Sequence, residues 1–405
     1  MQQGEVPQVL IATVGQTPDP VLASLMEHAP DGVIFIASQD SHPTAALILS
    51  EFKRELKHHT ILIEEPESLT ESYQAARKAL KKAKEWEARV ILAEITGGTK
   101  PMIAGLALAL TGQGVTFSYV GGTRRDEAGR VVSGHEKIRL LEDPTTRYYT
   151  QEWSAFRQAW NAGRMLEAQA WLERILSRPL TPSEERFHRH LLGITRGMDA
   201  WDRFQHAEAL ERFRAHLEPA LAVAEAWHHG AKVRVLTALE AAQGFLERIV
   251  QAKGKPVPEL LQDLLANAER RAQAGRYDDA LARLYRAVEL AAEVDLYERH
   301  QLWLRKPDAW PQGVPEYLKE RARGMLGLKE VLDLAFDLDL HFGASGTLAQ
   351  VLRGDYERKL RPLLQRRHES ILAHGTRPVT REDYEKMRDY LHSLGLEPAP
   401  EWPRW

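Results

Sequence analysis

An arginine and a histidine near the C-terminus have the residue types and the spacing for acid–base chemistry at a phosphate. Arg367 and His374 are separated by six residues. Histidine titrates near neutral pH, and the planar fork of arginine fits phosphate oxygens. On a helix a step of seven residues turns through about 700°, which would place both side chains on one face. Gly375 fits a helix C-cap and Pro378 prevents continuation, so we expect the pair at a helix end, where the dipole favours a protonated histidine.

Basic residues accompany this pair. We expect such a cluster to bind single-stranded RNA through its phosphates, with Arg361 and Arg366 among the contacts. The competing interpretation is a solvated basic helix that pairs with acidic neighbours. Ile371 and Leu372 are expected to anchor the helix to a core. The cluster comprises Arg353, Arg358, Lys359, Arg361, Arg366, Arg367 and His368.

The first 145 residues alternate short apolar runs with helical patterns. Runs rich in Val and Ile occupy 8–14, 32–38, 60–63, 89–95 and 115–120, and helical patterns occupy 18–27, 43–56, 69–84 and 101–110. This alternation predicts a doubly wound, parallel α/β sheet. A polar hairpin at 121–134 and a strand at 137–141 are expected to follow. Ligands of such sheets bind at the carboxyl ends of the strands.

The loop after the fourth run is the most distinctive of those at the carboxyl ends. It reads Thr96-Gly97-Gly98-Thr99-Lys100. The glycines allow close approach of the backbone, and the lysine lies at a helix start, so the loop is typical of an anion or nucleotide cradle. Neither a P-loop spacing nor a G-x-G-x-x-G fingerprint is present. The alternative is a tight turn without a ligand.

From about residue 145 the sequence is helical up to a polar tail near 398–405. Breaks at 162–164 and 204–208 indicate helical hairpins, and segments 161–176 and 274–290 resemble each other loosely without a regular repeat. A Gly/Pro/Lys break at 250–258 suggests another boundary. We therefore expect domains at 1–145, 146–255 and 256–405.

Composition limits the classes of function. The chain of 405 residues contains no cysteine, which excludes disulfides, thiolate metal sites and cysteine nucleophiles. A formal net charge of −3 provides no general basic field, so nucleic acid would need a local patch. No apolar run is long enough to cross a membrane and no signal peptide is visible, so we expect a cytoplasmic protein without membrane contact.

Two groups of residues resemble one known family. The sequence Val14-Gly15-Gln16-Thr17-Pro18, together with Thr96 to Met102, resembles the CRISPR-associated Rossmann-fold (CARF) domain. Arg367 to His374 matches the R-x(4–6)-H motif of HEPN ribonucleases. The order of the two, with helices between them, is similar to the ancillary ribonucleases of type III CRISPR systems.

The resemblance implies an activator-gated ribonuclease. A homodimer would bind a cyclic oligoadenylate, with the tetra-adenylate favoured over the hexa-adenylate, across its two-fold axis. Gly15, Gln16 and Thr17 would line one side of the ring, Ser38 and Gln39 would meet adenine or ribose, and the loop of Thr96, Gly97, Gly98, Thr99 and Lys100 would hold phosphates. Binding would favour the active arrangement of two HEPN domains.

The resemblance also implies cleavage of single-stranded RNA without a metal or cofactor. The 2′-OH of the RNA would attack the adjacent phosphorus and leave a 2′,3′-cyclic phosphate. His374 would be the general acid or base, Arg367 would stabilise the transition state, and His368 would orient the RNA. A composite site from two copies is expected. Lys100 with Thr96 or Thr99 would serve any activator-cleaving (ring nuclease) activity.

Two other functions fit parts of the sequence. One is a non-catalytic CARF sensor on a helical adaptor that binds a partner protein or nucleic acid. The other is a small-molecule enzyme on the sheet, for which Asp19, Asp40, His42 and Glu94 are present without a convincing acid–base pair.

Overall fold

The computed structural model describes residues 7–124, 135–304, 310, 312–322, 326–372 and 375–405. The chain divides into two compact units, Met1–Gln151 and Glu152–Trp405, and each is described by itself. Among the described residues, no helix is both long and apolar enough to cross a membrane.

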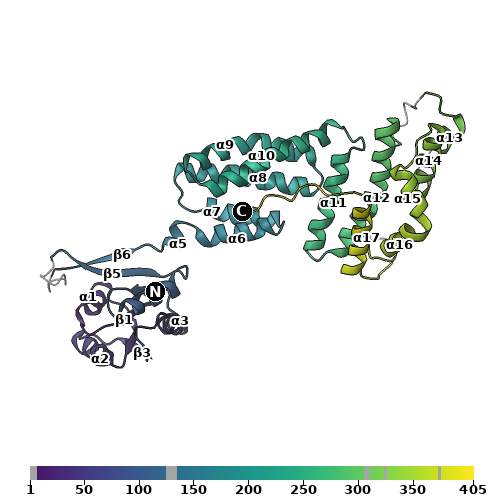
Figure 1. Cartoon of the computed structure of the whole chain (residues 1–405). Coiled ribbons are helices and arrows are strands. Elements are labelled where there is room, and N and C mark those ends of the chain that lie inside the picture. The colour runs from purple at the N-terminus through teal and green to yellow at the C-terminus, as the bar shows by residue number, and fades with distance from the viewer. Residues whose placement is uncertain (1–6, 125–134, 305–309, 311, 323–325, 373–374) are drawn as a thin grey trace, which may run out of the picture. The chain divides into compact units, whose positions relative to one another are not determined.

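The first unit is built on a six-stranded sheet, which confirms the α/β prediction (Figure 1). Its strands lie in the order β3-β2-β1-β4-β5-β6. The first five are parallel and β6 pairs antiparallel with β5. The bounds are β1 Gln8–Val14, β2 Gly32–Ser38, β3 Lys57–Ile63, β4 Val90–Glu94, β5 Thr116–Gly122 and β6 Glu136–Leu141. Strand β3 begins earlier than predicted because Lys57, a polar residue on the edge strand, pairs with Gly32.

Helices cover both faces of this sheet. The helices are α1 Asp19–His28, α2 His42–Glu51, α3 Leu69–Glu85, α4 Lys100–Leu110 and the short α5 Pro144–Arg147. Alternate residues of a strand face opposite sides. Leu10 and Phe35 therefore pack with α1 and α2, whereas Ile11 and Ile34 pack with α3 and α4. The strand side chains in both layers are buried, which explains why β1 and β2 are continuous apolar runs.

The second unit contains only helices among its described residues. They are α6 Thr150–Asn161, α7 Met165–Leu176, α8 Pro182–Asp202, α9 His206–Ala226, α10 Gly230–Gln251, α11 Pro258–Gln273, α12 Tyr277–His300, α13 Glu316–Arg321, α14 Leu328–His341, α15 Leu348–Asp355, the π-helical turn η1 Tyr356–Leu360, α16 Arg361–His368 and α17 Arg381–Ser393.

One turn conformation recurs between the helices of this unit. A residue with positive φ ends the turn after α6, α8, α9 and α11, and these residues are Gly163, Phe204, His228 and Gly275. In each turn the next amide donates to a carbonyl five residues back, as Arg164 does to Ala159 at 2.8 Å. The loose likeness of 161–176 and 274–290 therefore reflects a shared helical-hairpin turn.

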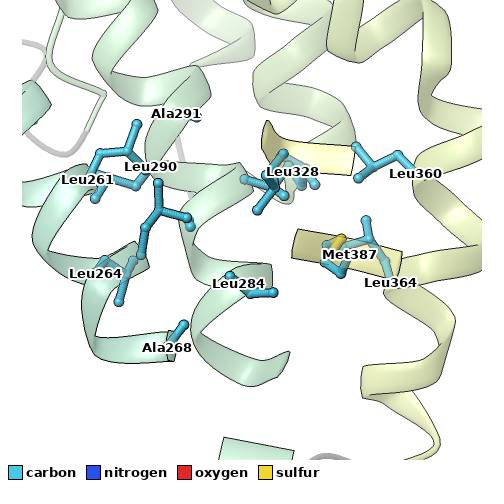
Figure 2. Close-up of a cluster of buried hydrophobic side chains, with 14 of the residues drawn as sticks. Leu261, Leu264, Ala268, Leu284, Leu290, Ala291, Leu328, Leu360, Leu364 and Met387 are labelled. Carbon is cyan, nitrogen blue, oxygen red and sulfur yellow. The ribbon is translucent and has the colours of Figure 1, made fainter. Parts of the chain in front are cut away.

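The later helices enclose their own core, shown in Figure 2. Leu261 and Leu264 of α11 and Leu284 of α12 meet side chains of η1, α16 and α17. Leu360 and Met387 are fully buried there. Removal of this apolar surface from water is the main force that holds α16, which carries Arg367, against α12.

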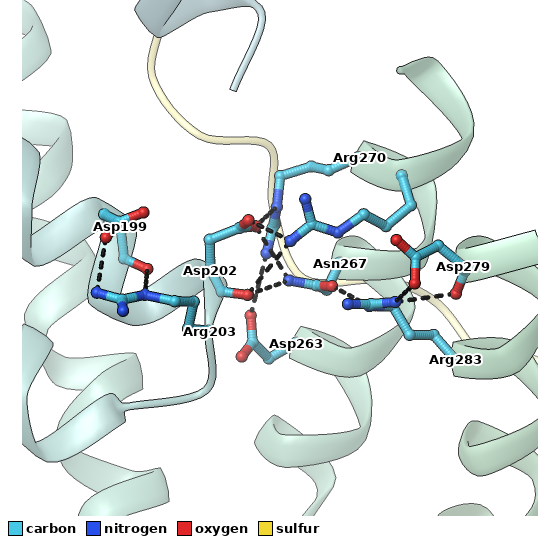
Figure 3. Close-up of polar contacts among 9 residues, drawn as sticks. Asp199, Asp202, Arg203, Asp263, Asn267, Arg270, Asp279 and Arg283 are labelled. Atoms are coloured by element: carbon cyan, nitrogen blue, oxygen red, sulfur yellow. Dashed lines mark hydrogen bonds and ion pairs between the residues drawn. The ribbon is translucent and has the colours of Figure 1, made fainter. Parts of the chain in front are cut away.

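A buried ionic network joins α8 to α11 (Figure 3). Asp202, the last residue of α8, accepts from Asn267 at 3.0 Å, from Arg270 at 3.1 Å and from Arg271. Asp263 is 1% exposed, and it accepts from Trp201 at 3.0 Å and bonds to His206 at 2.8 Å. Loss of one partner would leave a desolvated charge, so this network fixes the two helices together.

The segment after α17 runs past the contact between α8 and α11 and returns to α6 (Figure 1). Trp402 lies over the guanidinium of Arg270 at 3.9 Å and beside Trp201 at 5.5 Å. Trp160 donates to the carbonyl of Pro403 at 2.9 Å, and the ring of Trp405 lies 5.8 Å from that of Trp160. The extended tail therefore straps the last helices of the unit to the first.

We predict that Trp402→Ala weakens this strap. The loss of the ring over Arg270 and of its buried area should lower the free energy of unfolding by about 2 kcal/mol. Thermal unfolding and limited proteolysis of the tail measure the effect. Trp171→Ala is the matched control, because the cation over Trp171 is Arg174 of the same helix, 4.5 Å away. Equal shifts in the two variants would contradict the strap.

Candidate functional site

The loops after β1 and β4 lie against each other, since these strands are neighbours although far apart in sequence. A Cβ on Gly15 would lie 2.9 Å from the amide nitrogen of Gly98, and one on Gly97 would lie 2.6 Å from the carbonyl oxygen of Thr13. Gly98 has a φ of +93°, which favours glycine. The glycines are therefore required by backbone contact at the point where the strand order reverses, which is where such sheets bind ligands.

Two buried polar side chains hold these loops. Thr13 is fully buried and its hydroxyl donates to the carbonyl of Gly97. Glu94, also fully buried, accepts from the amides of Thr96 at 2.8 Å and Gly97 at 3.3 Å. Burial raises the pKa of Glu94, and the bonds from Thr96 and Gly97 oppose that rise. Glu94 thus shapes the loop. Thr13 is not evident as a functional residue from the sequence, because it lies within an apolar run.

The predicted phosphate loop has one side chain available for an anion. Thr99 caps α4, where its hydroxyl accepts from Met102 at 3.3 Å and donates to Pro66. The hydroxyl of Thr96 accepts from the amide of Val120 at 2.8 Å. Lys100 is exposed at the first position of α4 and forms no ion pair with any described residue. Its ammonium and the helix N-terminus would attract the same negative group.

The remaining sensor candidates lie at the same edge of the sheet. Ser38 is buried and exchanges hydrogen bonds with Ser41, whose hydroxyl accepts from its amide at 3.0 Å. Gln39, Gln16 and Thr17 are exposed. Because β2 is the parallel neighbour of β1, these loops end side by side with the glycine loops. Of the hairpin arginines, Arg124 is exposed, and Arg125 and Arg130 lie outside the described residues.

We predict that Thr13→Val loosens the sensor loops. Valine has nearly the same shape but leaves the carbonyl of Gly97 without its buried donor, which should cost about 1–3 kcal/mol. Thermal unfolding measures this loss, and titration with cyclic oligoadenylates should show weaker binding. Thr116→Val, an exposed change on β5 of the same sheet, is the control and should change neither. Unchanged stability of the Thr13 variant would contradict the assigned role.

The motif helix is shorter than predicted. Helices α15, η1 and α16 follow one another without a break, and α16 ends at His368. The prediction of one helix through residue 374 with Gly375 as its C-cap is therefore wrong. Pro362 lacks an N–H, so the carbonyl of Arg358 loses its usual helical donor, and the π-helical turn accommodates this.

A tight fold-back follows the helix. The amide of Gly375 donates to Ser370 at 3.2 Å and that of Arg377 donates to Glu369 at 3.0 Å. A Cβ on Gly375 would lie 2.0 Å from the carbonyl oxygen of Glu369, so glycine is required for this contact rather than for a cap. Val379 then donates to Asp278 of α12 at 3.3 Å. His374 lies outside the described residues.

Two apolar residues between the arginine and the histidine of the motif face solvent. Ile371 is 70% exposed and Leu372 is 48% exposed. The expectation that they anchor the helix to a core is therefore wrong, because the helix has already ended. Leu360 and Leu364 provide the anchor instead. One helical step of three or four residues beyond Leu364 leads to Arg367 and His368, of which Arg367 is half-buried and His368 is exposed.

Most of the basic cluster is paired with carboxylates. Arg361 bonds to Glu357 at 2.7 Å, and Arg366 pairs with Glu369 and Asp383, each at 3.4 Å. Carboxylates also meet Arg353, Arg358 and Lys359. Arg366 lines a groove of about 380 Å³ between α16 and α17. The basic side chains of these pairs are exposed, whereas Asp355 and Asp383 are mostly buried, so each pair contributes little to stability.

Arg367 differs from its neighbours. Among the described residues it pairs with no carboxylate, and its Nε atom is buried without a hydrogen-bond partner. Its guanidinium lies over the ring of Tyr285 at 4.8 Å, and the ring of His368 meets the same tyrosine edge-on at 5.8 Å. No pattern in the sequence identifies Tyr285, because α12 and α16 meet only in the folded chain. No carboxylate among the described residues neutralises this guanidinium, which suits the stabilisation of an anion.

We predict that Gly375→Ala disrupts the fold-back after the motif. The new methyl group would overlap the backbone of Glu369, so the loop must move, and RNA cleavage should fall at least about tenfold even if α16 stays folded. Gly354→Ala is the matched control, since a Cβ there meets nothing within 4 Å and alanine favours the helix. Melting curves and cleavage assays of both variants measure these effects. Cleavage by the Gly375→Ala variant at the wild-type rate would contradict the prediction.

The fold and the motif define a class, an α/β domain followed by helical hairpins and a helical domain of the HEPN type. A family model described as the Csm6 HEPN domain matches residues 249–395, and one described as the Csm6 6H domain matches residues 148–242. The chain belongs to the Csm6 family. The Arg367 motif, α11–α12 and α17 all fall within the HEPN match.

Matches among solved structures include Csm6 of Enterococcus italicus bound to cyclic hexa-2′-fluoro-hexa-dAMP. It is 12% identical with a TM-score of 0.40, covering 96% of this chain and 93% of that one. Can2 of Sulfobacillus thermosulfidooxidans in complex with cyclic tetra-adenylate is 12% identical with a TM-score of 0.27, covering 50% of this chain and 68% of that one. No curated protein matches the sequence. The family assignment rests on the two domain models, not on these superpositions.

Proposed function

We propose that this protein is a cyclic-oligoadenylate-activated, metal-independent endoribonuclease that cleaves single-stranded RNA in type III CRISPR defence. The observation that carries the proposal is Arg367, an arginine without a carboxylate partner among the described residues, at the end of a helix inside the Csm6 HEPN match. Its neighbours on the same helix are neutralised. An uncommitted guanidinium is what a dianionic transition state requires.

The proposed reaction is an internal transfer at phosphorus. The 2′-oxygen of the RNA forms a bond to the adjacent phosphorus while the bond to the 5′-oxygen breaks, giving a 2′,3′-cyclic phosphate and a free 5′-OH. His374 takes the proton of the 2′-OH or delivers one to the leaving oxygen. Arg367 stabilises the charge on the pentacovalent phosphorus, and His368 orients the RNA.

Two copies of the chain are expected to complete the site. One motif supplies one histidine, whereas the reaction needs both an acid and a base. The exposure of Ile371 and Leu372, which lie between Arg367 and His374 in the motif, supports a homodimer, because apolar side chains beside a polar site favour coverage by another surface. Arg361 and Arg366 would then receive RNA phosphates by exchanging the exposed carboxylates of Glu357 and Glu369.

The first unit is proposed to bind the activator. The close glycine loops, the exposed Lys100 and the start of α4 together favour a phosphate-bearing ligand. Two copies related by a two-fold axis would suit a ring with repeated units, with the tetra-adenylate favoured. Ring nuclease activity would have to use Lys100, since the hydroxyls of Thr96 and Thr99 already form hydrogen bonds within the fold.

The proposal predicts activator-dependent cleavage that survives EDTA. His374→Ala and Arg367→Ala should each lower kcat about 10²-fold or more, whereas Arg366→Ala should cost only a few-fold because that arginine is already neutralised. The assay uses labelled single-stranded RNA with cyclic tetra-adenylate, cyclic hexa-adenylate or neither. Analysis of the product ends identifies the 2′,3′-cyclic phosphate.

The outcomes separate the competing functions. Tight activator binding without cleavage in any condition would favour the non-catalytic sensor or adaptor. Equal losses for Arg366→Ala and Arg367→Ala would contradict the assignment of Arg367. Loss of cleavage on addition of EDTA would contradict a mechanism without metal. Shortening of the activator itself during the assay would indicate ring nuclease activity.

A further inference from the structure

Tyr285 of α12 contacts Arg367 and His368, the first two residues of the motif. The guanidinium of Arg367 lies 4.8 Å from the centre of the tyrosine ring, and the ring of His368 packs edge-on at 5.8 Å. Tyr285 is partly buried, and burial is the main cause that raises its pKa, so the phenol stays neutral. One aromatic side chain from another helix therefore supports the helix end at which the motif begins.

The choice of an aromatic ring has an electrostatic consequence. A carboxylate at this position would hold the guanidinium but would also cancel its charge, as happens at Arg366. The face of an aromatic ring attracts a cation through its quadrupole and adds no net charge. Glu289, one turn further along α12, is bonded to Arg286 at 3.2 Å. The charge of Arg367 is thus held in place without being neutralised by a described residue.

The hydrogen-bond donors of Arg367 are also left uncommitted. A ring contact uses the face of the guanidinium, whereas phosphate oxygens are bound by its edge. The Nε atom of Arg367 is buried and has no partner among the described residues. Contact with the ring therefore fixes the plane of the fork and uses none of its N–H donors.

We propose that Tyr285 is a positioning residue that clamps Arg367 through its ring and keeps the charge and the donors of that arginine available for the transition state. This inference rests on the proposed ribonuclease function. The clamp acts through Arg367, and the tyrosine itself touches no reacting atom. Its effect should appear in kcat rather than in the affinity for RNA or activator.

The test compares Tyr285→Leu with Tyr285→Phe in the full-length protein. Loss of the ring should lower kcat about tenfold and leave KM for RNA and activator binding within about twofold, whereas phenylalanine keeps the ring and should keep the rate. Tyr297→Leu is the matched control, because it removes an aromatic contact to Lys255, 5.5 Å away, about three turns further along the same helix. It should cleave like the wild type.

A second substitution tests whether the effect passes through the arginine. In an Arg367→Lys background, which lacks the planar fork, Tyr285→Leu should cause no further loss of kcat. A full rate for Tyr285→Leu, an equal loss for Tyr285→Phe, or an undiminished loss in the lysine background would each overturn the clamp.

The contact can be tested apart from catalysis. If the wild type cleaved no RNA with any activator, the proposed function would fail, and thermal unfolding would still examine the clamp. Tyr285→Leu and Arg367→Met should shift the unfolding midpoint by less together than the sum of their separate shifts, because each removes the same contact. Strictly additive shifts would overturn the inference.

Discussion

The pairing of Asp202 with Arg270 and Arg271 is the constraint on which the arrangement of the second unit depends. These charges belong to the ends of α8 and α11, one in the 6H match and the other in the HEPN match. Both arginines and the aspartate are mostly buried, so separation would leave charges without solvent or partner at a cost of several kcal/mol. With the strap through Trp402, this junction joins the HEPN helices to α8 by buried contacts. Rigid contacts of this kind can carry energetic coupling from one domain to the next.

The two candidate ligand sites differ from this junction, because each has a cation without a carboxylate partner among the described residues. Arg367 and Lys100 have no carboxylate partner among the described residues, whereas the other basic residues of the motif helix, such as Arg361, are paired. An unpaired cation is stabilised by hydration or by a neutral contact, as at Tyr285, and either can be exchanged for an incoming phosphate at little cost. Loops of close-packed glycine backbone and a helix end place these cations, so the binding energy of a phosphate is not spent on reorganising the chain.

The sequence predicted the sheet well because its signals are local. The sequence alone predicts the observed bounds of strands β1 and β2 and identifies the glycines of the loop after β4, whereas the contacts of those glycines with Gly15 and Thr13 require the folded chain. The motif was predicted less well. Its helix stops at His368 because of tertiary contacts, namely the fold-back of Gly375 onto Glu369 and the bond from Val379 to Asp278. No periodicity reports such contacts, nor the meeting of Tyr285 with Arg367, since they join segments far apart in the chain.

The early end of the helix also explains how a motif of variable spacing can serve one reaction. On a continuous helix, changing the gap between arginine and histidine from four to six residues would rotate the histidine by about 200° around the axis. One of the two side chains would then face away from the substrate. In this chain the regular helix ends at His368, directly after Arg367, and Gly375 is bonded back to Ser370. Beyond the helix end, helical phase no longer dictates the direction of a side chain. The arginine thus needs a fixed helical register, which Leu360 and Leu364 supply, whereas a loop can absorb one residue more or less before the histidine.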